Sequence, residues 1–367
     1  MIKRMRDVIW NAPILDCSGF AAAARGYLLA CEAAGIRCRA IDDSGSKNIK
    51  GFGLGKDVLD LYARMSDTSI SSSATWVCHH TPDKLRRTRQ QRNVGYTIFE
   101  MTTIPKAWTS YCNAMDEIWT ASEYSRKAFE NTGVTVPIRI LPHVIDQALF
   151  NPLANPWKIE NKRSFAFLSV FDFTPRKAWK DLLKAWWTAF PNKNEDVCLI
   201  LKVFFGGFSE DQRKDVMFRI ASYKREIGAS GAPILVYGHD VPQNDMPGLY
   251  AACDCYVGIS REGFGLPYAE ALSCGLQCIG PEVGGNRQFM TPENSLLVRY
   301  EGDEDIDPEM LRINPFFSGL RWAKHSWEHL VENMRTAASK GKATRMPNKI
   351  SDDLSPVSIG RQLISML

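Results

Sequence analysis

The 367-residue sequence lacks several features that would assign a protein to a class directly. It has no apolar run of about 18 residues, so no membrane-spanning helix is expected. Its ten cysteines include no Cys-x-x-Cys pair, and no His and Cys spacing of the zinc type occurs. The N-terminus is basic, but it has neither a long apolar core nor the cleavage site of a secretory signal. These absences predict a cytoplasmic protein with reduced thiols and with no metal or other cofactor.

The sequence also has no large excess of positive or negative charge, because its formal net charge is only +4. So mild an excess does not indicate nucleic acid as a partner. One basic run stands out within residues 84–92, and its cations are Lys84, Arg86, Arg87, Arg89 and Arg92. Two interpretations stay open: a solvated helical face, or contact with anionic lipid or with the phosphate of a lipid-linked acceptor.

The most informative stretch that is present predicts a strand, a glycine-bearing loop and a helix, beginning at residue 254. The apolar residues 255–259 are typical of a buried parallel strand, and a polar trio ending in Glu262 follows them. Gly263 and Gly265 allow a sharp turn and a close approach of the backbone to a ligand. The first-turn amides of the helix face this loop, so the loop is predicted to bind a diphosphate.

Two carboxylates, Glu262 and Glu270, bracket the loop with seven residues between them. Carboxylates accept hydrogen bonds from vicinal hydroxyls, so the pair suits a ribose and a second sugar on either side of a diphosphate. The helix N-terminus favours the charged form of Glu270, and we therefore expect both groups to be anions. This expectation argues against a glycosidase acid and base. Each Glu taken singly is equally compatible with a solvated surface residue.

The run Glu-Gly-Phe-Gly-Leu-Pro, followed by Glu-Ala-Leu-x-x-Gly, resembles the E-x7-E motif of retaining GT-B glycosyltransferases of the group 1, or family 4, type. The resemblance implies that Glu270 holds the ribose of a nucleotide sugar and that Glu262 approaches the sugar hydroxyls. It also implies that phosphate and sugar meet the amides of Gly263, Phe264, Gly265 and Leu266. Many relatives read Ser-Arg-Gly-Glu-Gly where this chain reads Ser-Arg-Glu-Gly, so its loop is shorter by one residue.

Cations follow two other predicted strands of the same half of the chain. Arg176 and Lys177 come after the apolar run 165–171, where fixed positive charge suits a leaving diphosphate. Surface charges at a helix start are the other interpretation, and relatives space the two cations as Arg-x4-Lys. Lys202, expected at the end of a strand over 197–201, is a reserve cation. The resemblance further implies that the loop with Gly238 and His239 borders the nucleobase.

The N-terminal half opens as strand, helix and strand over residues 8–15, 21–34 and 36–41. The first loop lacks G-x-G-x-x-G, which weakens a dinucleotide-binding interpretation. The resemblance places Gly19 under the donor diphosphate, although an ordinary tight turn explains it as well.

Polar residues end two further strands of this half. The strand at 76–78 ends at His79 and His80. Relatives carry a histidine there beside the transferred sugar, and either residue fits; a loop histidine bonded to a nearby carbonyl is the alternative. Glu100 ends a predicted strand over 93–100, and the resemblance places it near the acceptor.

Towards the C-terminus the pattern predicts an acidic loop over 301–308, a long amphipathic helix over 322–338, a polar loop over 339–353 and a final short helix. The expected fold is therefore α/β, of the GT-B kind, with two Rossmann-like domains facing each other across a cleft. Residues 1–152 form the acceptor-side domain, onto which the helix 354–367 crosses back. Residues 153–353 form the nucleotide-sugar domain.

The implied function is metal-independent, retaining transfer of a hexose-type sugar from a nucleoside diphosphate sugar to a glycan or lipid-linked acceptor. Polysaccharide biosynthesis in the cytoplasm, with or without peripheral contact with the inner face of the membrane, is the expected setting. Two alternatives stay open: a protein that binds a nucleotide sugar without catalysis, and an NAD(P) oxidoreductase. Donor-dependent stabilisation without release of nucleotide would indicate the first, and stabilisation by NAD(P) the second.

Overall fold

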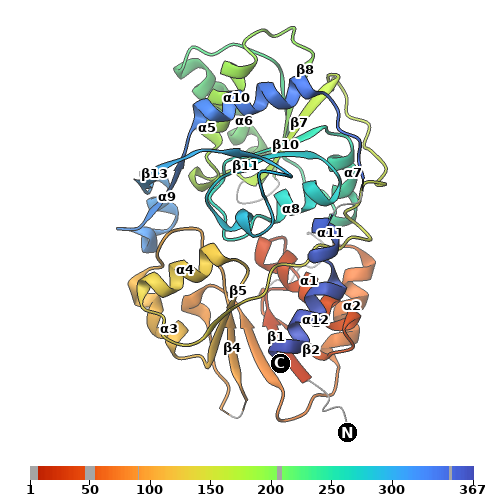
Figure 1. The fold of residues 1–367 in the computed structure, drawn as a ribbon, viewed down its shortest axis with the longest axis vertical. Helices are drawn as coiled ribbons and strands as arrows, with labels where there is room; N and C mark the ends of the chain where they lie inside the picture. Colours follow the sequence, from red (N-terminus) through yellow and green to blue (C-terminus); the bar gives the residue numbers. More distant parts are fainter. Residues whose placement is uncertain (1–6, 46–53, 90, 205–208, 347–348) are drawn as a thin grey trace. The chain divides into compact units, whose positions relative to one another are not determined.

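The computed structural model describes residues 7–45, 54–89, 91–204, 209–346 and 349–367. The chain divides into two compact units (Figure 1). Unit 1 consists of Met1–Ala148, Pro242–Asn244 and Lys349–Leu367, and unit 2 of Leu149–Val241 and Asp245–Asn348. The first boundary comes a few residues before residue 152, where the sequence analysis placed it.

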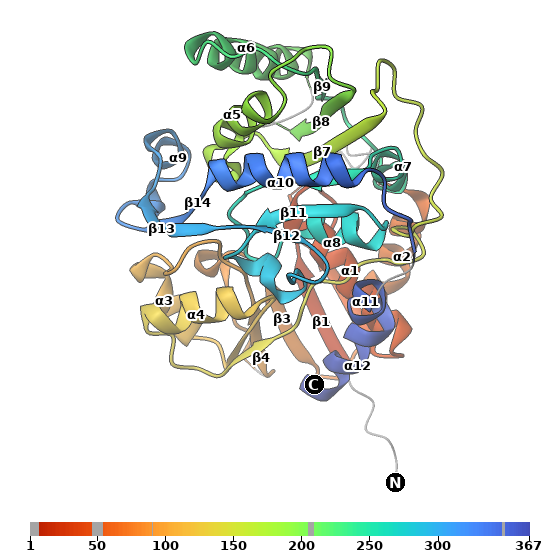
Figure 2. The same cartoon turned by 45° about the horizontal axis from the view of Figure 1, so that its top comes forward.

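Unit 1 is built on a parallel sheet whose order, among the described residues, is β2-β1-β3-β4-β5-β6. Its strands are β1 (Asp7–Ala12), β2 (Arg37–Asp42), β3 (Thr75–His79), β4 (Asn93–Tyr96), β5 (Glu117–Thr120) and β6 (Ile138–Ile140). Its helices are α1 (Gly19–Ala33), α2 (Lys56–Ser66), α3 (Thr109–Asn113), α4 (Glu123–Thr132), α11 (Lys349–Asp353) and α12 (Pro356–Met366), with the 3-10 turns η2 (Pro82–Lys84) and η3 (Lys106–Trp108). The C-terminal helix α12 packs against α1 (Figures 1 and 2).

Unit 2 contains a second parallel sheet, and its described strands have the order β12-β11-β10-β7-β8-β9. Its strands are β7 (Phe165–Asp172), β8 (Val197–Phe204), β9 (Ile234–Tyr237), β10 (Cys255–Val257), β11 (Gln277–Pro281) and β12 (Leu296–Val298). Its helices are α5 (Trp179–Ala189), α6 (Glu210–Glu226), α7 (Met246–Ala251), α8 (Leu266–Ser273), α9 (Pro308–Ile313) and α10 (Trp327–Lys340), with the 3-10 turns η4 (Pro175–Lys177), η5 (Gln243–Asp245, mostly in unit 1), η6 (Gly285–Gln288) and η7 (Pro315–Phe317).

The core of unit 2 explains why its strands read as continuous apolar runs. Most of β7 and β8 is buried, because helices cover both faces of a parallel sheet. Helix α10 packs beside α5, and Figure 2 shows the two helices lying on the sheet. Phe167, Trp186 and Phe190 form a mutual aromatic contact, with ring centroids 4.7–5.7 Å apart.

Three predictions for the C-terminal third are wrong. The acidic stretch is the strand β13 (Tyr300–Asp305), which pairs antiparallel with β14 (Arg321–His325). Trp322 therefore lies in a strand, and the helix begins only at Trp327, where Ser326 Oγ accepts the amide of His329. The stretch expected to be a polar loop contains helix α11.

The basic run is not a helical face. After the turn η2, residues 85–89 and 91–92 have no regular structure. Leu85 is buried, and Asn93 Oδ1 accepts the amide of Thr88, so the backbone follows tertiary contacts. Arg87 pairs with Asp116 at 2.9 Å and Arg92 with Glu117 at 2.6 Å.

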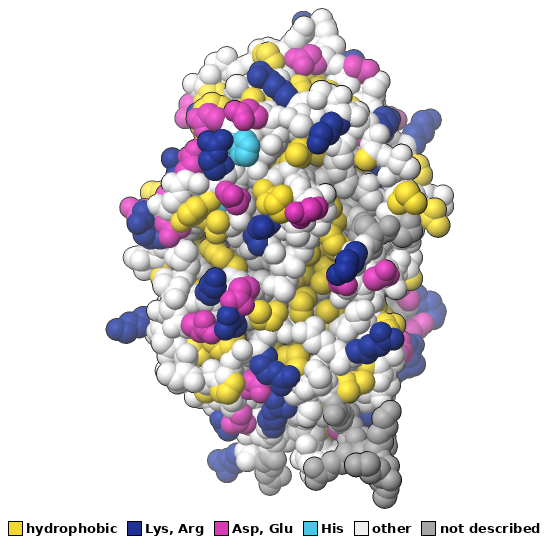
Figure 3. Space-filling view, in the orientation of Figure 1, with side chains coloured by type: hydrophobic (Ala, Val, Ile, Leu, Met, Phe, Trp, Pro, Cys, Tyr) yellow, Lys and Arg dark blue, Asp and Glu magenta, His cyan; other side chains and the backbone are white. Residues whose placement is uncertain are grey.

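The described helices include none with the length and apolar character needed to cross a membrane. On the face of the molecule in Figure 3, basic and acidic side chains are interspersed. The small net charge of the sequence is thus spread over mixed surface rather than gathered there into one patch.

Candidate functional site

The strand order of unit 2 selects one place for a ligand. Strands β7 and β10 are neighbours in the middle of the sheet, and the chain continues from β7 towards one edge and from β10 towards the other. Ligands of open parallel sheets bind beyond the carboxyl ends of the strands at such a switch point. The loop after β7 contains Arg176 and Lys177, and the loop after β10 contains Glu262.

These three side chains are in direct contact. Lys177 Nζ donates to Glu262 Oε1 at 2.5 Å, and an Arg176 guanidinium nitrogen lies 3.3 Å from Glu262 Oε2. The side chains of Glu262, Lys177 and Arg176 are only 12, 10 and 18% exposed, so water screens the contacts weakly. Burial acts to raise the pKa of Glu262, but the charges of Lys177 and Arg176 outweigh it and hold that pKa below its ordinary value. Glu262 is therefore an anion, as expected from the sequence.

Close backbone contacts fix the loop after Glu262. Gly265 precedes helix α8 with a φ of +92°, a conformation that a side chain would strain. The amide of Gly285 donates to the carbonyl of Glu262 at 2.7 Å, and a Cβ on Gly285 would lie 1.9 Å from the carbonyl oxygen of Gly263. At the start of α8, Pro267 has no N–H and the amide of Tyr268 donates to the carbonyl of Gly265 at 3.1 Å, so the amide of Leu266 is the one that this end offers to an anion.

Phe264 contributes to this loop differently. Its ring is 1% exposed and packs on Phe289, with ring centroids 5.0 Å apart. A ligand would therefore meet only the backbone of Phe264, and the side chain anchors the loop in the core.

Glu270 differs from the expectation in its charge. It lies in the fifth position of α8, and Tyr250 of α7 donates a hydrogen bond to Glu270 Oε2 at 2.7 Å. Burial raises the pKa of Glu270 to about 7, and the bond from Tyr250 offsets only part of that rise. The prediction that both carboxylates are fully anionic is thus wrong for Glu270, because burial outweighs a helix dipole that acts mainly on the first turn.

Lys202, Gly238 and His239 lie one strand further along. Strand β8 continues to Phe204, so Lys202 is inside the strand, level with Tyr237, and not at its end. Burial lowers the pKa of His239, and the positive charge of Lys202 lowers it further, which places these two groups near each other. Gly238 follows β9, and a Cβ there would approach only the flexible side chain of Arg213.

The four candidates of unit 1 lie in different environments. His79 is fully buried, and its Nδ1 accepts the indole N–H of Trp10 at 3.3 Å. Burial holds the pKa of His79 well below its ordinary value, so His79 is a neutral core residue. His80 is partly exposed, and its Nε2 lies 2.7 Å from Asp43 Oδ2, which makes it the better placed of the two to meet a ligand.

Gly19 and Glu100 gain little support from local geometry. Gly19 is the first residue of α1, and a Cβ there would meet nothing within 4 Å. Strand β4 ends at Tyr96, so Glu100 lies in the loop beyond it and not at the strand end that the sequence predicted.

Comparison with known proteins agrees with the geometry of unit 2. Residues 162–313 match the family model "Glycosyl transferases group 1". Apart from Pro242–Asn244, the matched residues all belong to unit 2. The chain is 31% identical to O-antigen chain mannosyltransferase B of Escherichia coli over 171 residues. The match covers 44% of this chain and 42% of that relative, so the chain spans less than half of the curated relative's length.

Solved structures show the same two-domain α/β architecture, the GT-B fold. A crystal structure of Anabaena HepE in complex with UDP and glucose is 13% identical, covers 98% of this chain and 99% of that one, and has a TM-score of 0.58. Trehalose 6-phosphate synthase from Burkholderia multivorans is 10% identical, covers 98 and 97%, and has a TM-score of 0.64. At these identities the likeness shows the fold alone.

Two residues of the site in unit 2 were not assigned a role by the sequence analysis. Tyr250 precedes the motif and has no local pattern to mark it. Arg261 is 5% exposed and donates to the carboxylate of Glu304 at 2.5 Å, while its guanidinium lies 4.5 Å from the ring centre of Trp322. A buried arginine beside Glu262 could have been suspected from the polar trio, but its partners lie on strands that the sequence did not predict.

Among the residues that the structure describes, no group of three or more His, Cys, Asp or Glu side chains is arranged for a metal ion.

Proposed function

We propose that this protein transfers a hexose-type sugar from a nucleoside diphosphate sugar to a glycan or lipid-linked acceptor, with retention of configuration at the anomeric carbon and without a metal. The observation that carries the proposal is the convergence of Lys177, Arg176 and Glu262 with the start of α8 at the switch point of unit 2. The named activity of the Escherichia coli relative and the ligands of HepE support the choice of substrate class.

The diphosphate is the centre of the proposed chemistry. Negative charge grows on its outer phosphate as the glycosidic bond breaks, and Arg176, Lys177 and the amide of Leu266 would stabilise that charge. Lys202 is a further cation of the same unit. The leaving phosphate oxygen accepts the proton of the attacking acceptor hydroxyl, which then bonds to the anomeric carbon from the face that the phosphate leaves.

The two glutamates would bind the sugars at either end of the donor. Glu262 accepts hydrogen bonds from the transferred hexose, and Glu270 accepts them from the ribose hydroxyls. Gly238 and His239 border the nucleobase in this assignment. In unit 1, His80 is assigned to the transferred sugar and Glu100 to the acceptor, while Gly19 stays assigned to the donor diphosphate.

The setting is part of the proposal. A polysaccharide or lipid-linked acceptor places the protein in the cytoplasm at the inner face of a membrane. Lys84, Arg86 and Arg89 remain exposed in the basic run and are available to anionic lipid.

The test is a screen of UDP, GDP, ADP and TDP sugars by melting temperature, followed by nucleotide release with the stabilising donor. We expect Glu270→Ala to keep the fold and lose donor binding, and Lys177→Ala to bind the diphosphate of the donor much more weakly and lose most turnover. Turnover should survive a chelator, and NMR of the product should show the anomeric configuration of the donor. Stabilisation by a donor without release of nucleotide under any acceptor would reject transfer, and an inverted product would reject retention.

A further inference from the structure

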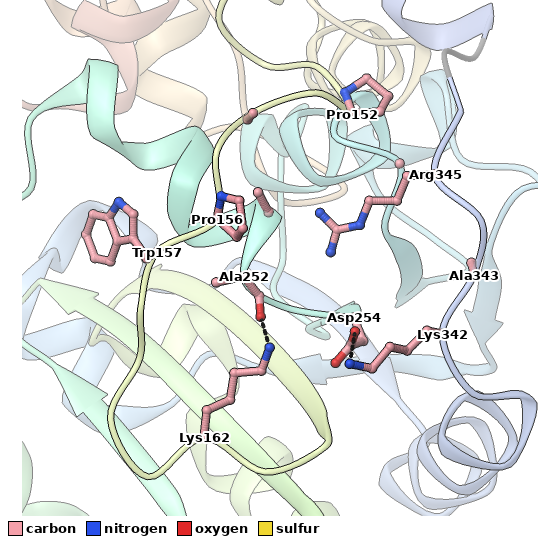
Figure 4. A pocket seen from close by; sticks show the side chains of 12 residues that line it. Pro152, Pro156, Trp157, Lys162, Ala252, Asp254, Lys342, Ala343 and Arg345 are labelled. Atoms are coloured by element: carbon pink, nitrogen blue, oxygen red, sulfur yellow. Dashed lines mark hydrogen bonds and ion pairs between the residues drawn. The ribbon is translucent and has the colours of Figure 1, made fainter.

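A cavity of unit 2 lies at the opposite end of its sheet from Glu262. Its volume is ≈ 560 Å³, within the size range of small-molecule sites. Asp254, in its wall, comes directly before β10, whereas Glu262 comes after that strand. The two segments that lead towards unit 1 also line it, residues 152–162 on one side and residues 342–345 on the other (Figure 4).

The cavity collects positive charge. Lys162, Lys342 and Arg345 line it, and Asp254 is the carboxylate among its lining residues. Lys162 Nζ donates to the carbonyl of Ala252 at 2.5 Å, and Arg345 donates to the carbonyl of Cys253, so two of the cations rest on neutral oxygens. Each of these bonds uses one donor of an ammonium or guanidinium group that carries several.

The carboxylate neutralises this charge only in part. Asp254 Oδ2 accepts the amide of Ala166, and its Oδ1 lies 3.7 Å from Lys342 Nζ, beyond hydrogen-bond distance. Asp196 does not line the cavity. Its carboxylate accepts the amide of Ser164 at 3.0 Å, and the charge of Lys342 is one of the causes that lower its pKa. Donors and positive charge therefore remain for an anion within the cavity.

We propose that this cavity binds a phosphorylated sugar. A phosphate group takes the remaining donors of Arg345, Lys342 and Lys162, which is the multi-donor arrangement that phosphate oxygens prefer. Phosphate alone would fill a small part of the volume. Asp254 Oδ1 can accept a sugar hydroxyl, so a phosphorylated sugar would use both the cations and the carboxylate that line the cavity. The proposal goes beyond the proposed transfer reaction and does not depend on it.

The experiment is calorimetric titration of the full chain with glucose 6-phosphate, inorganic phosphate and glucose. Since phosphate groups can also enter the proposed donor site, each titration is repeated in Lys177→Ala. We expect glucose 6-phosphate to bind both proteins alike, phosphate to bind more weakly, glucose not to bind, and affinity to fall with added salt.

The deciding variant is Lys342→Glu, because that side chain is 60% exposed and its replacement leaves the core untouched. We expect it to weaken binding by roughly tenfold or more, as loss of a charge-assisted contact does. Lys340→Glu is the matched control, an exposed lysine two residues away and outside the cavity, and it should bind as the wild type does. Arg345→Gln should weaken binding as well.

Three outcomes would overturn the proposal. They are absence of binding by both phosphate probes, equal affinity of Lys342→Glu and wild type, and loss of binding in Lys177→Ala, which would assign the anion to the donor site.

Discussion

The residues that would hold the diphosphate are engaged with a carboxylate in the ligand-free protein. The Glu262 carboxylate lies 2.5 Å from Lys177 Nζ and 3.3 Å from an Arg176 guanidinium nitrogen. All three side chains are mostly buried, so water screens these ion pairs only weakly. A nucleoside diphosphate that uses these cations must therefore compete with Glu262 for their N–H groups. The intramolecular ion pairs lower the affinity for nucleotide by the free energy needed to rearrange them.

Glu262→Gln should accordingly raise affinity for the bare nucleoside diphosphate, by on the order of tenfold, while lowering turnover. The amide keeps the size of the side chain but removes the competing charge. Calorimetric titration with nucleotide, paired with a release assay, measures both effects. Glu332→Gln, at an exposed position of α10 in the same unit, is the control and should change neither. A fall in nucleotide affinity in Glu262→Gln would contradict the competition.

The raised pKa of Glu270 makes a second residue-scale prediction, about stability against pH. The carboxyl has a pKa of about 7 in the folded protein and 4.5 as its ordinary value, so between these limits the folded state holds the proton more tightly. Stability therefore falls as pH rises from about 4.5 to about 7, by on the order of 3 kcal/mol from this group. Urea unfolding of Glu270→Gln should lack this fall, whereas Glu332→Gln, at an exposed site, should keep it.

The same pKa predicts how donor binding depends on pH. If ribose hydroxyls donate to the Glu270 carboxylate, donor affinity should increase as pH rises through about 7, because protonation removes an acceptor. The Gln variant should bind more weakly but with a flat profile over the same range. A profile in Glu270→Gln that matches the wild type would assign the titration to another group.

Sequence reasoning located these residues better than it described their state. The spacing of Glu262 and Glu270 around two glycines is a local signal, and the structure shows the loop and helix that it predicted. The charge of Glu270 depends on burial beneath α7 and on Tyr250, which no local pattern contains. His79 is a comparable case, since a histidine at a strand end looks accessible until Trp10 and the neighbouring rings cover it.

At the scale of elements, the β13–β14 pair supports the loop that carries Glu262. Arg261 reaches from that loop to the carbonyl of Ala323 at 3.0 Å and to Glu304 at 2.5 Å. Its own backbone exchanges hydrogen bonds with Arg176, amide to carbonyl at 3.1 Å and guanidinium to carbonyl at 2.7 Å. Arg261 is thus a positioning residue that links the two loops of the site to the two-stranded sheet.

Glu304→Gln tests this link. Replacing the carboxylate weakens the charge-assisted bond to a buried guanidinium, so the loops should be held less firmly. We expect kcat to fall several-fold and the melting temperature to change little. Asp305→Asn is the control on the same strand, because that side chain is 95% exposed and should leave kcat as it is. Equal effects of the two substitutions would show that Glu304 does not act through Arg261.

The sequence pattern mispredicted β13, β14 and the start of α10 for a physical reason. Residues 322–338 contain apolar positions compatible with one long helix, and the capping residue Ser326 is the signal that the helix begins later. Strand β14 exists because it pairs with β13 across a connection that itself contains α9. Such pairing depends on tertiary contact rather than on propensity.

At the scale of the whole molecule, each half of the chain builds its own sheet and core, so the two units are expected to lose structure in separable steps. The α/β class and the two parallel sheets followed from the order of apolar runs. The strand order that defines the site did not, because it is a property of the assembled sheet.

Leu363→Ala tests the separation. Leu363 is fully buried on α12, the helix that packs on α1, and its truncation should cost about 3 kcal/mol in unit 1. Scanning calorimetry should show the unfolding of unit 1 moving to lower temperature while a donor still stabilises the other transition. Val357→Ala, at a position 42% exposed on the same helix, should cost under about 1 kcal/mol. A shift of both transitions together would show that the units unfold as one.

The place of α12 also sets an order for folding during translation. Helix α12, which covers α1, follows all the strands and helices of unit 2 in the sequence, so the sheet of unit 1 is synthesised first, but its α1 face is covered only after α12 has been made. All the strands and helices of unit 2 precede residue 349, so they have all been synthesised before α12. Unit 1 therefore starts to form first and is completed last, and a chain truncated before residue 356 would carry the complete second sheet but a first sheet whose α1 face is uncovered.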